Sequence, residues 1–173
     1  MLIRNAMVIV CVTLLTSCAT SYKPPTGTST AKLLVYAPQT KTFASVQIVG
    51  YASNECENPM SLGMIGGIVS NASDEKLNIP KPDNYKADAF VERLIPAGKR
   101  YLFSVRSFLP GKTCVITSSF VPMVDHNYEA SIVWENNVCH LGFGKIEVSS
   151  EGKVKSLDEP TYRKEQTCNK GLN

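Results

Sequence analysis

The sequence predicts an all-β domain: an antiparallel β-sandwich stapled by disulfides. Three observations predict it. Between residues 100 and 148, apolar and polar residues alternate with a period of two, which is typical of half-buried strands. Turns rich in Gly, Pro, Asn and Asp separate these runs at roughly ten-residue spacing, as in sandwiches and barrels. Four cysteines are spread over residues 56–168.

The first part of the domain reads as strands with one ambiguous segment. Strands are expected at 32–36 and 43–49, with a turn at 38–41 between them and a polar loop at 51–58. Residues 62–69 are apolar and rich in glycine. They predict a strand or buried hairpin with a tight turn at Gly66-Gly67, because glycine readily takes positive φ.

The second part has the clearest pattern. A long polar surface loop is expected at 70–87. Five strands then follow, at 90–95, 101–105, 114–120, 128–134 and 138–148. Tyr128, Ala130, Ile132 and Trp134 share one face of their strand, and we expect this face in the core with Phe103 and Phe120. The pattern favours a sandwich of the Ig-like or a similar type.

The N-terminus has the pattern of an export signal. Residues 1–5 carry one charge, Arg4, and residues 6–15 are apolar apart from Thr13, as in a secretory signal. This run is shorter than the about 20 residues that span a bilayer. It leads into Leu15-Thr16-Ser17-Cys18, which resembles the lipobox of bacterial lipoproteins. The resemblance covers only these first 18 residues. It implies that residues 1–17 are removed and that Cys18 becomes the lipidated first residue.

The same resemblance implies a location. An Asp after the lipidated cysteine tends to retain a lipoprotein in the inner membrane, and this chain has Ala19 there. We therefore expect a lipid anchor in the outer membrane, with the domain facing the periplasm. Residues 18–30 are rich in Pro, Gly, Ser and Thr, which is typical of a flexible tether. The twelve residues 19–30 would reach roughly 40 Å when extended.

The remaining cysteines indicate two disulfides. Outside the cytoplasm, Cys56, Cys114, Cys139 and Cys168 are expected to pair, and three pairings are possible. We favour Cys114 with Cys139, which would join neighbouring strands, and Cys56 with Cys168, which would hold the end of the chain. The β domain is then expected at 31–150, followed by a loosely structured tail at 151–173.

Charge and motifs exclude several function classes. The mature chain of 156 residues carries 17 basic and 15 acidic side chains, a net charge of +2. This is too small to indicate a nucleic-acid partner. The Gly111-Lys112-Thr113 sequence lacks the earlier glycine of a phosphate loop. His126 lies in a turn-like Asp-His-Asn sequence, and His140 is isolated in an expected strand. No catalytic, cofactor or metal motif remains, and we expect no enzyme.

A second resemblance concerns residues 96–139. Pro96 to Lys99, Tyr101-Leu102-Phe103, Cys114, Phe120-Val121-Pro122, Tyr128, Trp134 and Cys139 form an order similar to that in uncharacterised proteobacterial lipoproteins with β-sandwich domains. It implies an envelope lipoprotein and no particular activity. Two hypotheses follow: a non-enzymatic module that binds an envelope protein partner, or a binder of a small ligand or glycan or inhibitor of a cell-wall-degrading enzyme.

Overall fold

The computed structural model describes residues 22–38, 45–53, 55–66, 76–82, 85, 87 and 89–168. The expected signal peptide and Cys18 lie outside these residues. Within them, no helix is long and apolar enough to cross a membrane. The strands are β1 Thr30–Tyr36, β2 Ser45–Tyr51, β3 Pro59–Gly66, β4 Phe90–Pro96, β5 Tyr101–Leu109, β6 Lys112–Phe120, β7 Asn127–Glu135, β8 Val138–Val148, β9 Val154–Leu157 and β10 Arg163–Glu165.

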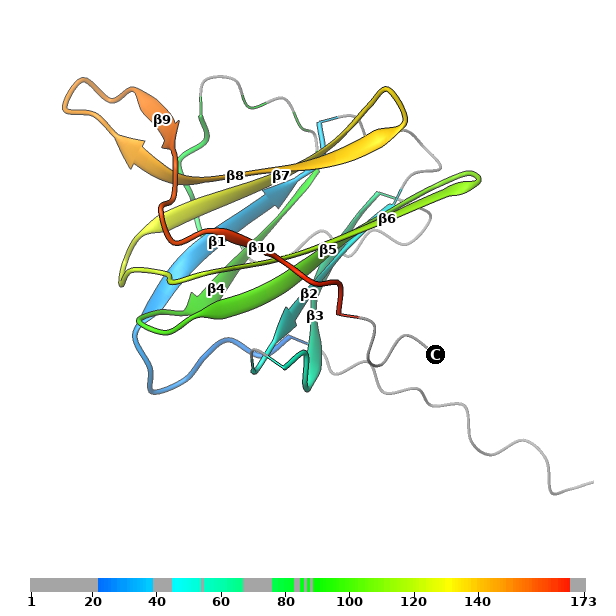
Figure 1. Cartoon of the computed structure of the whole chain (residues 1–173). Coiled ribbons are helices and arrows are strands. Elements are labelled where there is room, and N and C mark those ends of the chain that lie inside the picture. Colours follow the sequence, from blue (N-terminus) through cyan, green and yellow to red (C-terminus); the bar gives the residue numbers. More distant parts are fainter. Residues whose placement is uncertain are drawn as a thin grey trace, which may run out of the picture.

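The strands form two packed sheets of five strands each (Figure 1). The β5 sheet has the order β10-β6-β5-β2-β3, and its described pairs are all antiparallel. The β1 sheet has the order β4-β1-β7-β8-β9. Its pairs are antiparallel except β1 with β7, which run parallel. The predicted disulfide-stapled β-sandwich is therefore confirmed.

The core lies between the sheets and follows the predicted alternation. Tyr128, Ala130 and Ile132 of β7 are buried on one face, opposite Phe103 of β5 and Phe120 of β6. The rings of Phe120 and Tyr128 lie 4.8 Å apart at a tilt of 58°, a favourable arrangement for two aromatic side chains. Phe103, Phe120 and Tyr128 therefore meet in one cluster as predicted, whereas Trp134, expected on the same core face, is only half-buried near the end of β7.

The expected surface loop at 70–87 covers part of the β1 sheet. Among its described residues, Ile79 is 3 % exposed, and it packs with Leu34 and Tyr36 on the outer face of this sheet. Glu92 of β4 is 1 % exposed beneath the segment. It accepts a hydrogen bond from the backbone N–H of Leu77 and pairs with Lys81 at 3.1 Å. This mainly polar segment therefore covers a second, smaller apolar cluster on the β1 sheet.

The β3 region differs from the sequence expectation at its start. The strand begins at Pro59, before the expected apolar segment at 62–69 and directly after the expected loop at 51–58. Tyr51, which was assigned to that loop, is instead the buried final residue of β2. Gly66 ends β3 with φ of 73°, and Gly67 lies outside the described residues. The described part of 62–69 is therefore one strand, paired with β2.

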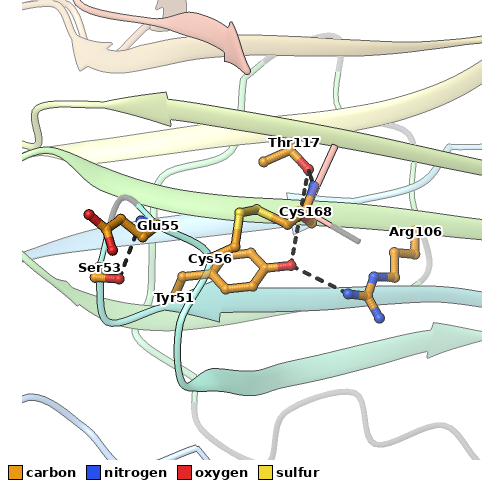
Figure 2. Close-up of a disulfide and its surroundings, with 8 residues drawn as sticks. Tyr51, Ser53, Glu55, Cys56, Arg106, Thr117 and Cys168 are labelled. Atoms are coloured by element: carbon orange, nitrogen blue, oxygen red, sulfur yellow. Dashed lines mark hydrogen bonds between the residues drawn. A yellow bond between two sulfur atoms is a disulfide. The ribbon is translucent and has the colours of Figure 1, made fainter. Parts of the chain in front are cut away.

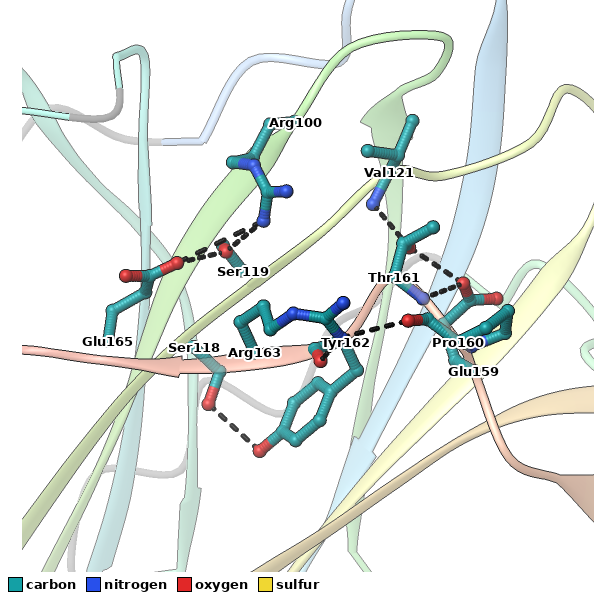
Figure 3. A network of polar contacts seen from close by, with 10 residues as sticks. All are labelled: Arg100, Ser118, Ser119, Val121, Glu159, Pro160, Thr161, Tyr162, Arg163 and Glu165. Carbon is teal, nitrogen blue, oxygen red and sulfur yellow. Dashed lines mark hydrogen bonds and ion pairs between the residues drawn. The ribbon is translucent and has the colours of Figure 1, made fainter.

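The prediction of a loosely structured tail at 151–173 is wrong for the part of it that the structure describes. It contributes the edge strands β9 and β10, and the ring of Tyr162 stacks on Phe143 at 4.8 Å. Figure 3 shows how polar contacts fasten this segment: Tyr162 hydrogen-bonds Ser118 at 3.0 Å, and Thr161 accepts a bond from the backbone N–H of Val121 at 2.9 Å. The sequence did not indicate these strands, because they are short and their mostly polar residues show no alternation.

The segment expected as a tether is also partly attached to the domain. Its described residues 22–29 have no regular secondary structure. However, Tyr22 packs against the core, and its hydroxyl donates a hydrogen bond to the backbone oxygen of Leu94 at 2.7 Å. The guanidinium of Arg93 lies 4.9 Å from the centre of the same ring. The free part of the tether is therefore shorter than the sequence predicted.

Candidate functional site

Two hairpins end side by side at one end of the sandwich (Figure 1). Cys114 of β6 and Cys139 of β8 form a disulfide, with 6.4 Å between their Cα atoms. Lys112 donates a hydrogen bond to the side-chain oxygen of Asn137. We call residues 107–114 and 134–140 the cross-linked tip.

The sequence of each turn accounts for its tightness. Two residues connect each pair of strands. Asn136 and Asn137 have φ of 49° and 65°, and a two-residue hairpin loop with two positive φ values favours asparagine. Gly111, in the other turn, has φ of 73°, which glycine adopts without steric cost. Both hairpins can therefore project without a long loop.

The disulfide of the tip joins opposite sheets. The prediction that Cys114 and Cys139 lie on neighbouring strands is wrong, because β6 and β8 belong to different sheets. The hairpins face each other across the core. Besides the disulfide and the Lys112–Asn137 hydrogen bond, the indole N–H of Trp134 donates to the Ser107 hydroxyl at 2.9 Å. These three links hold the two sheets together at the tip.

The tip exposes apolar side chains on both of its outer faces. Phe108 is 38 % exposed and Val138 is 55 % exposed. Side chains alternate along a strand, so Phe108 lies on the face opposite to buried Ser107, and Val138 on the face opposite to Cys139. Within the tip, Lys112 and Glu135 are the two charged residues and cancel each other. The tip is therefore a rigid wedge with little net charge and one apolar residue on each side.

The second disulfide anchors the end of the described chain. Cys56, in the connection between β2 and β3, pairs with Cys168, and their Cα atoms lie 5.6 Å apart. Figure 2 shows this bond above a row of polar groups on the outer face of the β5 sheet. Both disulfides in the structure match the pairing favoured from the sequence.

The polar groups beneath Cys168 form a continuous chain. The Tyr51 hydroxyl lies 3.1 Å from the Ser104 hydroxyl, which lies 2.8 Å from that of Thr117. Thr117 accepts a hydrogen bond from the backbone N–H of Cys168 at 3.2 Å. Each of the four residues has a partner, so the chain connects β2, β5, β6 and the C-terminal segment.

Arg106 is the unexpected member of this face. Alternation predicts it on the solvent side of β5, but it is only 7 % exposed. Its guanidinium donates to the Tyr51 hydroxyl at 3.3 Å, while its buried Nε has no hydrogen-bond partner among the described residues. No described carboxylate forms an ion pair with it. This side chain is held at a cost, since an unpartnered buried polar group is unfavourable.

The other candidates from the sequence do not come together. The His126 ring contacts the backbone oxygen of Val124 at 2.8 Å in a turn, and His140 is exposed on β8. They lie near opposite ends of the β7–β8 hairpin. Among the described residues, no group of three His, Cys, Asp or Glu side chains could hold a metal ion.

Sequence reasoning missed the buried carboxylates of the β1 sheet. Glu92 and Glu129 lie opposite Leu34 on either side of it in the strand register, and both are less than a tenth exposed. The Tyr36 hydroxyl donates to Glu129 at 3.3 Å, and burial followed by the charge of Glu129 raises the pKa of Tyr36. No local pattern marks these glutamates, because the segment that covers Glu92, which includes Leu77 and Lys81, is polar in sequence and reads as a surface loop.

Comparison with known proteins gives no family for this chain. No protein-family model matches it, and no curated protein matches it at a significant level.

Proposed function

We propose that this protein is a lipid-anchored lipoprotein of the bacterial envelope whose cross-linked tip binds a protein partner, without enzymatic activity. One observation carries the proposal: a rigid, nearly uncharged wedge exposes Phe108 on one side and Val138 on the other. Protein interfaces favour aromatic anchors and few charges at their centre. A wedge with two apolar sides fits a groove on its partner, and pre-formed geometry lowers the entropic cost of binding.

The membrane anchor of this proposal depends on Cys18. The lipobox-like Leu15-Thr16-Ser17-Cys18 supports it, and extracytoplasmic conditions favour the two disulfides of the domain. Mass spectrometry of the N-terminal peptide should find Cys18 acylated at the first position. An unacylated chain in the cytosolic fraction would overturn the anchor and, with it, the outer-membrane location.

Photo-crosslinking tests the binding surface. A benzophenone amino acid replaces Phe108 or Val138 in the full-length chain, expressed in its own host. The matched control replaces Leu157, an apolar residue of β9 that is 41 % exposed. We expect one discrete protein adduct from both tip positions and none from position 157. Absence of a tip adduct, or the same adduct from all three positions, would contradict the proposal.

The wedge shape also favours a second candidate, inhibition of a cell-wall-degrading enzyme. Such enzymes hold their substrate in a cleft, which a projecting tip of this kind can fill. The purified domain lacking Cys18 should then inhibit lysozyme, and a Phe108→Ser, Val138→Ser double variant should not. If neither protein inhibits lysozyme, this candidate fails while the crosslinking result still decides the first.

A further inference from the structure

The end of the sandwich opposite the tip has a distinct composition. Three segments meet there: residues 22–30, 96–100 and 121–127. Backbone hydrogen bonds tie them together, from Ala97 to Ser29 at 2.9 Å, from Gly98 to Pro122 at 2.8 Å and from Asp125 to Thr30 at 2.9 Å. We call this the N-terminal end of the sandwich (Figure 1).

Two adjacent large apolar side chains project from this end. Met123 is 54 % exposed and Val124 is 46 % exposed. The same loop is held in place by the Tyr128 hydroxyl, which accepts a hydrogen bond from the backbone N–H of Met123 at 2.9 Å. The pair is therefore presented on an ordered loop rather than buried in the core.

The charge of this end is positive, unlike that of the tip. Residues 22–30, 96–100 and 121–127 carry Lys23, Lys99 and Arg100 against a single acid, Asp125, a net charge of +2. Arg100 lies 4.0 Å from Glu165. Lys23 and Lys99 are exposed and form no ion pair with any described residue. Apolar side chains beside basic ones are the combination that binds an anionic lipid surface.

Tyr22 limits how far this end can move from the anchor. Its hydroxyl is bonded to Leu94, two residues before the end of β4. Four residue steps separate Cys18 from Tyr22, which span about 14 Å at full extension. The tip lies farther off by the length of β5, nine residues, or about 30 Å.

We propose that the N-terminal end docks on the anionic lipid surface of the membrane that holds Cys18, with Met123 and Val124 entering the headgroup region and Lys23 and Lys99 contacting lipid phosphates. This inference rests on the proposed lipid anchor. Tyr22 acts as a clamp that keeps this end at the bilayer. The cross-linked tip consequently points away from the lipid, where a protein partner can reach it.

Lipid photo-crosslinking tests the orientation. The acylated full-length protein is reconstituted in vesicles of phosphatidylethanolamine and phosphatidylglycerol. The benzophenone amino acid replaces either Met123 or Val138, which are matched at 54 % and 55 % exposure. We expect several-fold more phospholipid adduct from position 123. Equal yields, or a higher yield from position 138, would overturn the proposal.

Two further variants test the clamp and the charges, with their thermal unfolding midpoints measured alongside. Tyr22→Ala should bring the two adduct yields close together, because the tether regains its full length. Lys23→Ser with Lys99→Ser should lower the yield at position 123. A yield ratio unchanged in either folded variant would overturn that part of the inference.

The same samples separate this inference from the proposed function. If mass spectrometry finds Cys18 unacylated, the anchor fails and the docking proposal fails with it. If Cys18 is acylated and the yields at 123 and 138 are equal, the anchor stands and only the docking is overturned. Protein adducts at Phe108 and Val138 test the proposed partner binding, and their outcome does not depend on the lipid adducts.

Discussion

The indole N–H of Trp134 donates a hydrogen bond to the hydroxyl of Ser107, 2.9 Å away, across the two sheets. In the strand register, Ser107 is opposite Cys114 and Trp134 is opposite Cys139. The two register pairs form two sides of a square of four residues, and the hydrogen bond and the disulfide form the other two sides, which connect the sheets. One of these connecting sides is covalent, and the other is reversible.

Ser107→Ala should weaken the tip without changing its fold. The substitution leaves the half-buried indole N–H without its partner, which costs about 1 kcal/mol of unfolding free energy. Denaturant unfolding of the soluble domain measures this loss. Ser150→Ala, at an exposed position of the β8–β9 turn, is the control and should be neutral. A neutral Ser107→Ala would show that the bond does not contribute.

The two disulfides should differ in their contribution to stability. Sequence separations are 112 residues for Cys56–Cys168 and 25 for Cys114–Cys139. In the chain-entropy model these loops correspond to about 5 and about 3.5 kcal/mol. Paired Cys→Ala variants, compared by denaturant unfolding, should rank in this order. A larger loss of stability for the Cys114–Cys139 variant would mean that the Cys56–Cys168 disulfide adds little beyond the noncovalent contacts that already hold the C-terminal segment.

Arg106→Met should leave the stability unchanged or raise it. The guanidinium is buried with an unpartnered Nε, and apolar replacement of such a group removes its desolvation cost. Tyr51→Phe should instead destabilise by about 1 to 2 kcal/mol, because it removes the link between Arg106 and Ser104. Thermal and denaturant unfolding check both variants. A strongly destabilised Arg106→Met would assign this side chain a stabilising role that its described contacts do not explain.

Glu92→Gln should loosen the segment that covers the β1 sheet. The carboxylate accepts the Leu77 N–H and pairs with Lys81; Lys81 is 32 % exposed, so solvent screens part of this pair. We expect a loss of about 1 to 2 kcal/mol and faster hydrogen exchange at Leu77. Glu147→Gln, which breaks the exposed pair with Lys145, is the control and should change neither. Unaltered exchange at Leu77 would contradict the role of Glu92.

Alkaline pH should destabilise the domain through its buried tyrosines. Burial is the main cause that raises the pKa values of Tyr101, Tyr128 and Tyr162 above 10.0. The unfolded chain therefore ionises first, and stability that is complete below pH 10 falls as pH rises above it. For fully buried Tyr101 the slope is about 1.4 kcal/mol per pH unit. Unfolding between about pH 8 and pH 11 measures the fall, which Tyr101→Phe should reduce.

The sequence predicted the parts of this fold that depend on local alternation. The strands from Phe90 to Val148 and the core face of Tyr128 follow directly from a period of two. The strands β9 and β10 could not be predicted, because they are short edge strands, paired with β8 and β6, whose mostly polar side chains show no alternation.

The candidate site was predictable only in part. Cysteine positions indicated the two disulfides, but not that Cys114–Cys139 spans opposite sheets, since sheet membership depends on the whole topology. The attachment of Tyr22 to the domain had no signal either, because a lone tyrosine among Pro, Ser and Thr is typical of a linker. Its role depends on Leu94, far away in the chain.

Strand β1 has a consequence for when the domain can form. It is made early, yet it lies between β4 and β7, and its parallel pairing sets Leu33 beside Tyr128. One edge of β1 therefore cannot pair until β7, nearly a hundred residues later in the chain, has been synthesised. We expect the β1 sheet to be completed late in synthesis, once both of these neighbours are present.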